Sequence, residues 1–385
     1  MWVPPVSESS KGPESSKELV LPPPLPLIKS SAGQRLVWCL SAADSEQPAG
    51  RILPLLLDGY LQQFRSHEQA VLADKGIEDL HALRVSLRRA RALLSLGGSV
   101  FPAAQRTELM RQMGEFGRSS SQVRDLDILL EDVPKLLHDS GFYGNKPGED
   151  SDAQLLQQTL AGTREAAFAE LAQAIHPAAR TVPNIHLVSS QPASEYAAML
   201  RNWQILASVH RLGGDDPGAD ALLPATIAAQ TAMLKQFSKM RSAGRTAQKS
   251  GESADWHRLR KCSKALRYAL VGFGPLFAQD PKSELVLRLR KLQNVLGLSQ
   301  DHAVQVDLIE QAGLSAGGRA ALLAGALSVH LRQLAVHDQR LCSQAWSRFD
   351  HKGYKQELQM ALLVRTRPSR GAEGTRSSNR LDVPR

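Results

Sequence analysis

The sequence has few of the residues that disulfide frameworks, zinc sites and base-stacking surfaces require. Its 385 residues include three cysteines, Cys39, Cys262 and Cys342, which form no C-x-x-C pair and leave an odd count. A disulfide framework or a structural zinc site is therefore not expected. Aromatic residues make up 5% of the chain, which argues against a stacking platform for single-stranded nucleic acid.

Other functional signatures are missing as well. No apolar run reaches the roughly 18 residues of a transmembrane helix, and the N-terminus lacks the charged and apolar regions of a signal peptide. We therefore expect a cytoplasmic protein without membrane association. No G-x-S-x-G motif, Walker-type loop or pair of catalytic carboxylates occurs. The dipeptides His138-Asp139 and His337-Asp338 resemble those of metal phosphohydrolases but lack a supporting upstream histidine. We expect no cofactor and no enzymatic activity.

Positive charge, in contrast, is abundant. Lysine and arginine number 47 against 38 acidic residues, so the formal net charge is +9 and the isoelectric point is about 9.6. This balance indicates an anionic partner, which is nucleic acid, polyphosphate or an acidic surface. Net charge alone does not distinguish among these partners.

The most distinctive stretch, HALRVSLRRAR, runs from His81 to Arg91 without proline, glycine or an acidic residue. Apolar residues of helical period accompany it: Leu80, Leu83, Leu87, Ala90 and Leu94. On a helix, four basic residues form a stripe beside them: His81, Arg84, Arg88 and Arg91. Arg89 stands off this stripe. Like charges at these spacings repel one another, which indicates that an anion faces them.

The same stripe recurs 176 positions later. Its second copy consists of His257, Arg260, Lys264 and Arg267. The same offset of 176 separates Asp79 from Asp255 and Asp125 from Asp301, so it holds over the whole region from residue 79 to residue 125. A constant offset over this span predicts an internal duplication.

Four motifs in order resemble the CHAD domain family. They are H-x-x-R-V-x-x-R-R-x-R from His81, R-D-L-D from Arg124, H-R-L-R-K-x-x-K-x-L-R-Y from His257 and L-Q-x-x-L-G-x-x-x-D from Leu292. The resemblance covers roughly residues 51 to 350. It implies an all-α fold of two four-helix halves around a basic groove or channel. It also implies binding of inorganic polyphosphate, often at polyphosphate granules, rather than catalysis.

The helical periodicity predicts an all-α, internally duplicated bundle between two tails. A proline- and serine-rich tail is expected at 1–50, the first half at 51–211, the second half at 219–350 and a basic tail at 366–385. Expected helices lie at about 52–73, 77–96, 102–120, 122–137, 152–175, 193–211, 222–242, 254–273, 282–297, 300–312 and 316–350. The glycine- and proline-rich segment 213–218 marks the join between the halves.

The stripes and the resemblance together predict one polyanion site. Its residues are His81, Arg84, Arg88, Arg89, Arg91, Arg124, His257, Arg260, Lys261, Lys264, Arg267 and Tyr268. Related by a pseudo-twofold axis, the two stripes would face one shared groove, and arginine forks would grip phosphate oxygens. The expected partners are inorganic polyphosphate and granule-associated proteins.

Other functions stay open at this point. One is an enzyme or accessory subunit acting on phosphate polymers or nucleotides, and another is a general nucleic-acid binder, which fits less well because aromatics are scarce. A metal site would require His81, His257, Asp125 and Asp301 to converge, and the surrounding arginines would repel a dication, so no metal is expected. Asp125 and Asp301 are instead expected to cap helices or to form salt bridges.

Overall fold

The fold is all-α, as the sequence predicts. The computed structural model describes residues 27–29, 36–38, 40, 44–74, 76–141, 151–179, 194–212, 218–277, 284–351 and 353–362. The predicted C-terminal tail, 366–385, lies outside the described residues, as do most of the predicted N-terminal tail and most of the join between the halves.

Helices account for nearly all of the described residues. They are α1 (Ala49–Ser66), α2 (Glu68–Leu72), α3 (Ile77–Leu96), α4 (Ala103–Asp139), α5 (Ser151–Ala179), α6 (Glu195–Leu212), α7 (Ala225–Ser250), α8 (Ser253–Phe273), α9 (Glu284–Ala316), α10 (Gly318–Phe349) and α11 (Tyr354–Ala361). A short 3-10 helix, Gly274–Leu276, follows α8.

Two predicted breaks are wrong, because α4 and α9 each run continuously through them. The first break was predicted at residue 121, the last of three consecutive serines. Instead, the hydroxyls of Ser119 and Ser120 donate hydrogen bonds back to the carbonyls of Phe116 and Gly117, at 3.1 and 3.3 Å. Serine is tolerated inside a helix when it bonds to the preceding turn in this way. The second break was predicted at residues 298 and 299. Helix α9 instead continues through these residues, and it contains no proline that would interrupt it.

Two short strands are a further difference, since the prediction contained none. Strand β1 (Leu27–Lys29) pairs antiparallel with β2 (Leu36–Trp38), with Leu27 opposite Trp38 and Lys29 opposite Leu36. This hairpin lies within the segment predicted to be a tail, and β2 contacts α1. It leaves the all-α class of the domain unchanged.

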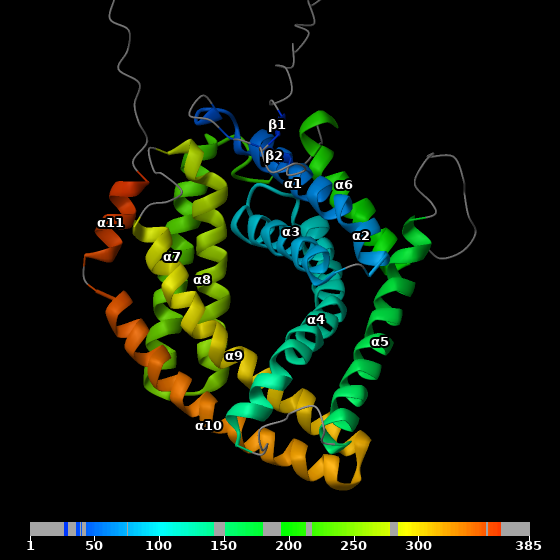
Figure 1. Cartoon of the computed structure of the whole chain (residues 1–385). Coiled ribbons are helices and arrows are strands. Elements are labelled where there is room, and N and C mark those ends of the chain that lie inside the picture. Colours follow the sequence, from blue (N-terminus) through cyan, green and yellow to red (C-terminus); the bar gives the residue numbers. More distant parts are fainter. Residues whose placement is uncertain are drawn as a thin grey trace, which may run out of the picture.

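The basic helices α3 and α8 lie side by side near the middle of the molecule (Figure 1). Helix α1 packs on α3 and α6, whereas α7 packs on α8. The long helices α4 and α9 lead away from α3 and α8, and α5 and α10 pack against them. Helix α11 lies on the outer side of α7, away from α3 (Figure 1).

A reciprocal backbone contact joins the starts of α1 and α7. Pro48 and Pro224 precede these helices and form a bridge. The amide of Ala49 donates to the carbonyl of Leu223 and the amide of Ala225 to the carbonyl of Gln47, both at 2.8 Å. The two donors, Ala49 and Ala225, are 176 positions apart in the sequence, and so are the two acceptors, Gln47 and Leu223. Helices α3 and α8 begin at Ile77 and Ser253, again 176 positions apart.

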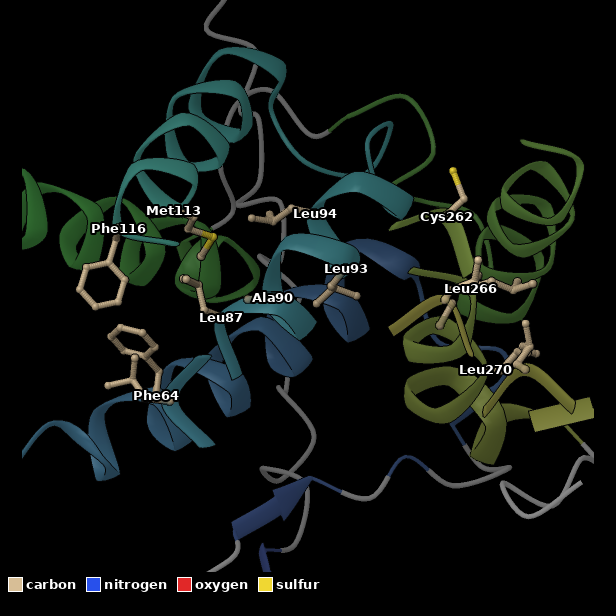
Figure 2. Close-up of a cluster of buried hydrophobic side chains, with 14 of the residues drawn as sticks. Phe64, Leu87, Ala90, Leu93, Leu94, Met113, Phe116, Cys262, Leu266 and Leu270 are labelled. Atoms are coloured by element: carbon tan, nitrogen blue, oxygen red, sulfur yellow. The ribbon is translucent and has the colours of Figure 1, made fainter. Parts of the chain in front are cut away.

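One continuous core holds the helices together. On the α1 side, the rings of Phe64 and Phe116 meet edge to face with centroids 5.5 Å apart. Leu87, Leu93 and Leu94 extend this cluster along α3, and Leu266 and Leu270 occupy the α8 side (Figure 2). Because α3 and α8 bury their apolar faces in this core, the basic residues beside those faces are fixed in place. Within the described ranges, none of the helices combines the length and hydropathy that a membrane-spanning segment requires.

Gly244 allows α7 to pack closely on α10, and this contact yields a stability prediction. A Cβ atom at Gly244 would overlap the indole ring of Trp346, which is 3% exposed. Gly244→Ala should therefore lower the free energy of unfolding by about 1–3 kcal/mol, because a packed ring must shift. Gly162 on α5 has open space around it, so Gly162→Ala should raise stability by about 0.5–1 kcal/mol. Urea denaturation measures both values, and equal effects at the two positions would contradict this packing.

Candidate functional site

Helix α3 carries the first basic stripe along the edge of its buried face. The helix begins after Gly76 and ends at Gly97, and Glu78 and Asp79 in its first turn complement the helix dipole. Leu83 and Leu87 are 0% and 2% exposed. The basic side chains next to them are consequently drawn halfway into the protein. Arg84, Arg88, Arg89 and Arg91 are half-buried, and His81 is exposed.

Helix α8 repeats this arrangement. Leu259 and Leu266 are fully buried on its apolar face. Its predicted site residues lie beside that face: His257, Arg260, Lys264, Arg267 and Tyr268 are half-buried, and Lys261 is exposed. Arg124, the remaining predicted residue, is half-buried on α4. Thus ten of the twelve predicted residues are half-buried.

Electrostatic interactions connect the two stripes across the α3–α8 contact. Burial lowers the pKa of Lys264 to about 7, and the positive charges of Arg260 and of Arg88 on α3 lower it as well. Burial also lowers the pKa of Arg267, and among the charges that add to this effect are Arg89 and Arg88. The stripes therefore lie close enough to repel each other, and they form one cationic cluster.

Arg84 is held in place by helix α4. Its Nη1 donates to the carbonyl of Gly117 at 3.2 Å and to Oγ of Ser120 at 2.9 Å, and its Nη2 donates to Oγ of Ser121 at 2.9 Å. Burial lowers the pKa of Arg84 to about 10, with Arg88 adding to the effect and Asp125 opposing it. Sequence reasoning missed these serines, because nothing in their spacing indicates a partner on α3.

Arg260 has the corresponding position against α9. Its Nη2 lies 3.4 Å from Oδ1 of Asp301, and a methyl group at Gly297 would lie 3.7 Å from the same Nη2. Gly297 follows Ser121 by 176 positions, as Arg260 follows Arg84. Each arginine thus lies beside the matching position of its neighbouring long helix.

Asp125 and Asp301 do not cap helices, so the capping alternative is wrong and the salt-bridge alternative is confirmed for Asp301. Both lie inside long helices, because α4 and α9 are continuous. Burial raises the pKa of Asp125 and of Asp301, while the charges of Arg84 and Arg260, respectively, lower them. These carboxylates interact with the first arginine of each stripe, and the contact of Asp301 orients the guanidinium group of Arg260.

Several other arginines of the cluster hold buried donors without partners. Among the described residues, no hydrogen-bond acceptor reaches the buried Nε atoms of Arg88, Arg91, Arg124 and Arg267. Nη1 of Arg124 and Nε of Arg260 share this condition. A buried donor without a partner costs about 1–3 kcal/mol, and more when it is charged. Anionic oxygens entering the cluster would supply the missing acceptors.

Arg89 and Tyr268 lie at one edge of the cluster. With Leu56 and Tyr60 they line a cavity of about 10 Å³, which has room for little more than one water molecule. The guanidinium of Arg267 lies over the Tyr268 ring at 5.0 Å from its centroid. This tyrosine packs against an arginine and has little free ring surface to offer a ligand.

Two further cations belong to the cluster and were not predicted. The charge of Arg118 on α4 contributes to the lowered pKa of Arg91, after burial, and Arg290 on α9 contributes likewise to that of Arg267. Neither position repeats, since Asn294 and Gly114 stand at the matching positions. A search for repeated basic residues therefore misses them.

The histidines are less basic than usual. Although much of the His81 side chain is exposed, partial loss of solvent and then Arg88 lower its pKa, and burial and then Lys261 lower the pKa of His257. In the described part of the chain, no three His, Cys, Asp or Glu side chains lie close enough together to hold a metal ion. Of the HD dipeptides, His138 contacts its neighbour Asp139 at 3.2 Å, whereas Asp338 pairs with His302 at 2.7 Å.

Comparison with known families now assigns the chain. The family model of the CHAD domain matches residues 55–310, a span that includes both stripes, helix α4 and most of helix α9. The chain belongs to the CHAD family. No curated protein matches this CHAD chain.

Two solved structures share the CHAD fold of the chain. The CHAD domain of the plant Ricinus communis is 20% identical, with a TM-score of 0.58, and the match covers 82% of this chain and 95% of the plant chain. PptA from Streptomyces chartreusis is 18% identical, with a TM-score of 0.54, and the match covers 78% of this chain and all of the other. At these identities the likeness concerns the fold alone.

The lowered pKa of Lys264 predicts how the stability of this CHAD domain depends on pH. An unfolded lysine with the ordinary pKa of 10.5 binds its proton more tightly than folded Lys264 does. The unfolded state therefore carries more protons between pH 7 and 10.5, and the free energy of unfolding rises with pH in this window. Denaturant unfolding from pH 7 to 9.5 should show a flatter rise for Lys264→Met than for the wild type.

Lys261→Met is the matched control, because Lys261 is exposed one turn away. This variant should keep the wild-type slope. If Lys264→Met and the wild type had the same slope, the shift assigned to Lys264 would be refuted.

Proposed function

We propose that this protein binds inorganic polyphosphate through the α3 and α8 stripes and does not turn it over. The observation that carries the proposal is the set of buried arginine nitrogens that lack acceptors, on two helices whose charges repel each other. A linear phosphate chain would supply both acceptors and negative charge along its whole length. Membership of the CHAD family supports the same ligand.

The geometry of one stripe suits a linear polyanion. Arg84 and Arg91 are seven residues apart, which is roughly 10 Å at the helical rise of about 1.5 Å per residue. Several successive phosphate units fit along such a stripe. Each charge-assisted hydrogen bond contributes about 1.5–3 kcal/mol before the costs of association. Arg84 and Arg260, held by α4 and α9, are the first arginines of the two stripes, and further basic residues follow them along each helix.

We infer that both stripes contact one ligand, because the repeat relates them in space as well as in sequence. The reciprocal bonds of Ala49 and Ala225 follow the 176-residue offset. So do the hydrogen bond of Arg84 to Ser121 and the position of Arg260 beside Gly297. These matched contacts support the predicted duplication, with the α3–α8 contact lying between the halves.

Nucleic acid fits this site less well than polyphosphate. Sequence-tolerant binding of single strands relies on bases stacking on aromatic rings. Tyr268 is the only aromatic residue among the predicted site residues, and its ring packs beside Arg267. Polyphosphate has no bases and needs none of this surface.

The absence of turnover is inferred from the carboxylates of the cluster. A hydrolase needs a group that is free to activate water at the phosphorus. Asp301 instead lies against Arg260, and Asp125 interacts with Arg84. A cytoplasmic location at polyphosphate granules, next to granule-associated proteins, completes the proposal and rests on the family resemblance. Colocalisation of the tagged chain with a polyphosphate stain tests it.

Titration with fluorescently labelled polyphosphate tests the proposed function. Affinity should fall steeply between about 50 and 200 mM salt, because phosphate binding releases condensed counterions. Unlabelled RNA and DNA should compete poorly at equal phosphate concentration, and no phosphate should be released with magnesium or manganese present. Arg88→Gln should weaken binding at least tenfold, whereas Lys239→Gln, an exposed change on α7, should have less than a twofold effect.

Three results would count against the proposal. A salt-independent affinity would exclude the electrostatic mode of binding. Equal competition by RNA would favour a nucleic-acid binder, and released phosphate would favour an enzyme of phosphate polymers.

A further inference from the structure

A second basic recess lies on the outer side of the molecule, between α7 and α11. It encloses about 450 Å³, within the usual size range of small-molecule sites. Four cations line it: Arg241, Arg245 and Lys249 on α7 and Lys355 on α11. None of them belongs to the α3 and α8 stripes, and α11 covers the side of α7 that faces away from α3 (Figure 1).

The three cations on α7 form a column, because they follow one another at steps of four residues. One acidic residue, Asp350, holds two of them. Its Oδ1 accepts from Nε of Arg241 at 2.5 Å, and its Oδ2 accepts from Nε of Arg245 at 3.3 Å. Both bonds use Nε, and no hydrogen bond between described residues involves the terminal nitrogens of these two guanidinium groups. One carboxylate thus orients two guanidinium groups and leaves their forks free.

The recess is also rigid. Phe237 lies at its base, is 1% exposed and stacks on Tyr354 with centroids 5.3 Å apart. The guanidinium of Arg241 lies 5.9 Å from the centre of the Phe237 ring. The side chains of Arg241 and Asp350 are 22% and 13% exposed. Arg241, the first of the three cations in the column, is therefore held in place before any ligand arrives, which lowers the entropic cost of binding.

The charge in the recess is not balanced. Four cations face one carboxylate, and like charges four residues apart on a helix repel each other. The first half of the chain offers no counterpart: Arg65, Gln69 and Ala73 stand 176 positions before the three basic residues of α7. Arg65 there lies 3.7 Å from Glu68. The column is thus confined to the second half and is separate from the repeated stripes.

We propose that this recess binds a di- or triphosphate group, carried by an inorganic oligophosphate or by a nucleotide. Two free guanidinium forks grip phosphate oxygens in pairs, as planar donors do. The ammonium groups of Lys249 and Lys355 add charge from the two helices, and the Ser242 hydroxyl adds a donor between them. A compact anion with three or four charges matches the excess charge of the recess.

The test uses the full chain carrying Arg88→Gln and Lys264→Gln, so that the stripes contribute little. Inorganic triphosphate is titrated into this chain by calorimetry, with ATP in a parallel titration. The pocket variant adds Arg245→Gln and Lys249→Gln, which are both exposed positions. The matched control adds Lys235→Gln and Lys239→Gln, which remove the same charge from exposed positions of the same helix. Arg241 is left intact because it anchors Asp350.

The expected result is one triphosphate site that the pocket variant weakens at least tenfold and the control less than twofold. Arg245→Lys, which keeps the charge but loses the fork, should give an intermediate affinity. Tighter binding of triphosphate than of ATP would assign the inorganic ligand, and the reverse order would assign the nucleotide. Circular dichroism of each variant should show unchanged helix content.

Three results would overturn the proposal. They are no triphosphate binding by the stripe-reduced chain, no effect of the pocket variant, or an equal loss in the control variant. Labelled polyphosphate binding by the wild type is measured separately. Failure of the recess and failure of the stripe site therefore give different results.

Discussion

The arrangement of the CHAD domain depends on burying the apolar faces of α3 and α8 in one core. Leu83 and Leu87 on α3 and Leu259 and Leu266 on α8 are at most 2% exposed, and burial of each such side chain contributes about 1.5–3 kcal/mol. This burial brings two rows of like charge together and removes part of their hydration. The pKa of Lys264, lowered to about 7, records the electrostatic cost.

The long helices α4 and α9 determine which arginines remain free. Ser120 and Ser121 on α4 and Asp301 on α9 hold the first arginine of each stripe. The later arginines keep buried nitrogens without acceptors. Each stripe therefore combines a held arginine with at least one further arginine whose Nε lacks an acceptor, which suits a ligand with many identical phosphate groups. The recess on α7 follows the same principle, since Asp350 occupies Nε of two arginines and leaves their forks open.

The sequence predicts the helices that glycine delimits and misses contacts that depend on tertiary packing. The range predicted for α3, 77–96, agrees with the structure at both ends, because Gly76 and Gly97 flank it. The helix α4 is longer than predicted, because its serines bond to the preceding turn. The predicted break at residue 121 also makes Asp125 a candidate helix cap, which the continuous helix α4 rules out. The stripes were visible as a repeat, whereas Arg118, Arg290 and the α7 recess were not, because they have no repeated counterpart.

The most direct test of the account asks whether the two stripes bind one ligand together. A short polyphosphate of defined length is titrated by calorimetry into a chain whose recess is disabled by Arg245→Gln and Lys249→Gln. Arg88→Ala with Arg91→Ala cuts the α3 stripe, and Lys264→Ala with Arg267→Ala cuts the α8 stripe. The account predicts that either pair of changes lowers affinity at least tenfold and leaves the stoichiometry unchanged. Stoichiometry halved by either pair, with the remaining affinity intact, would contradict it.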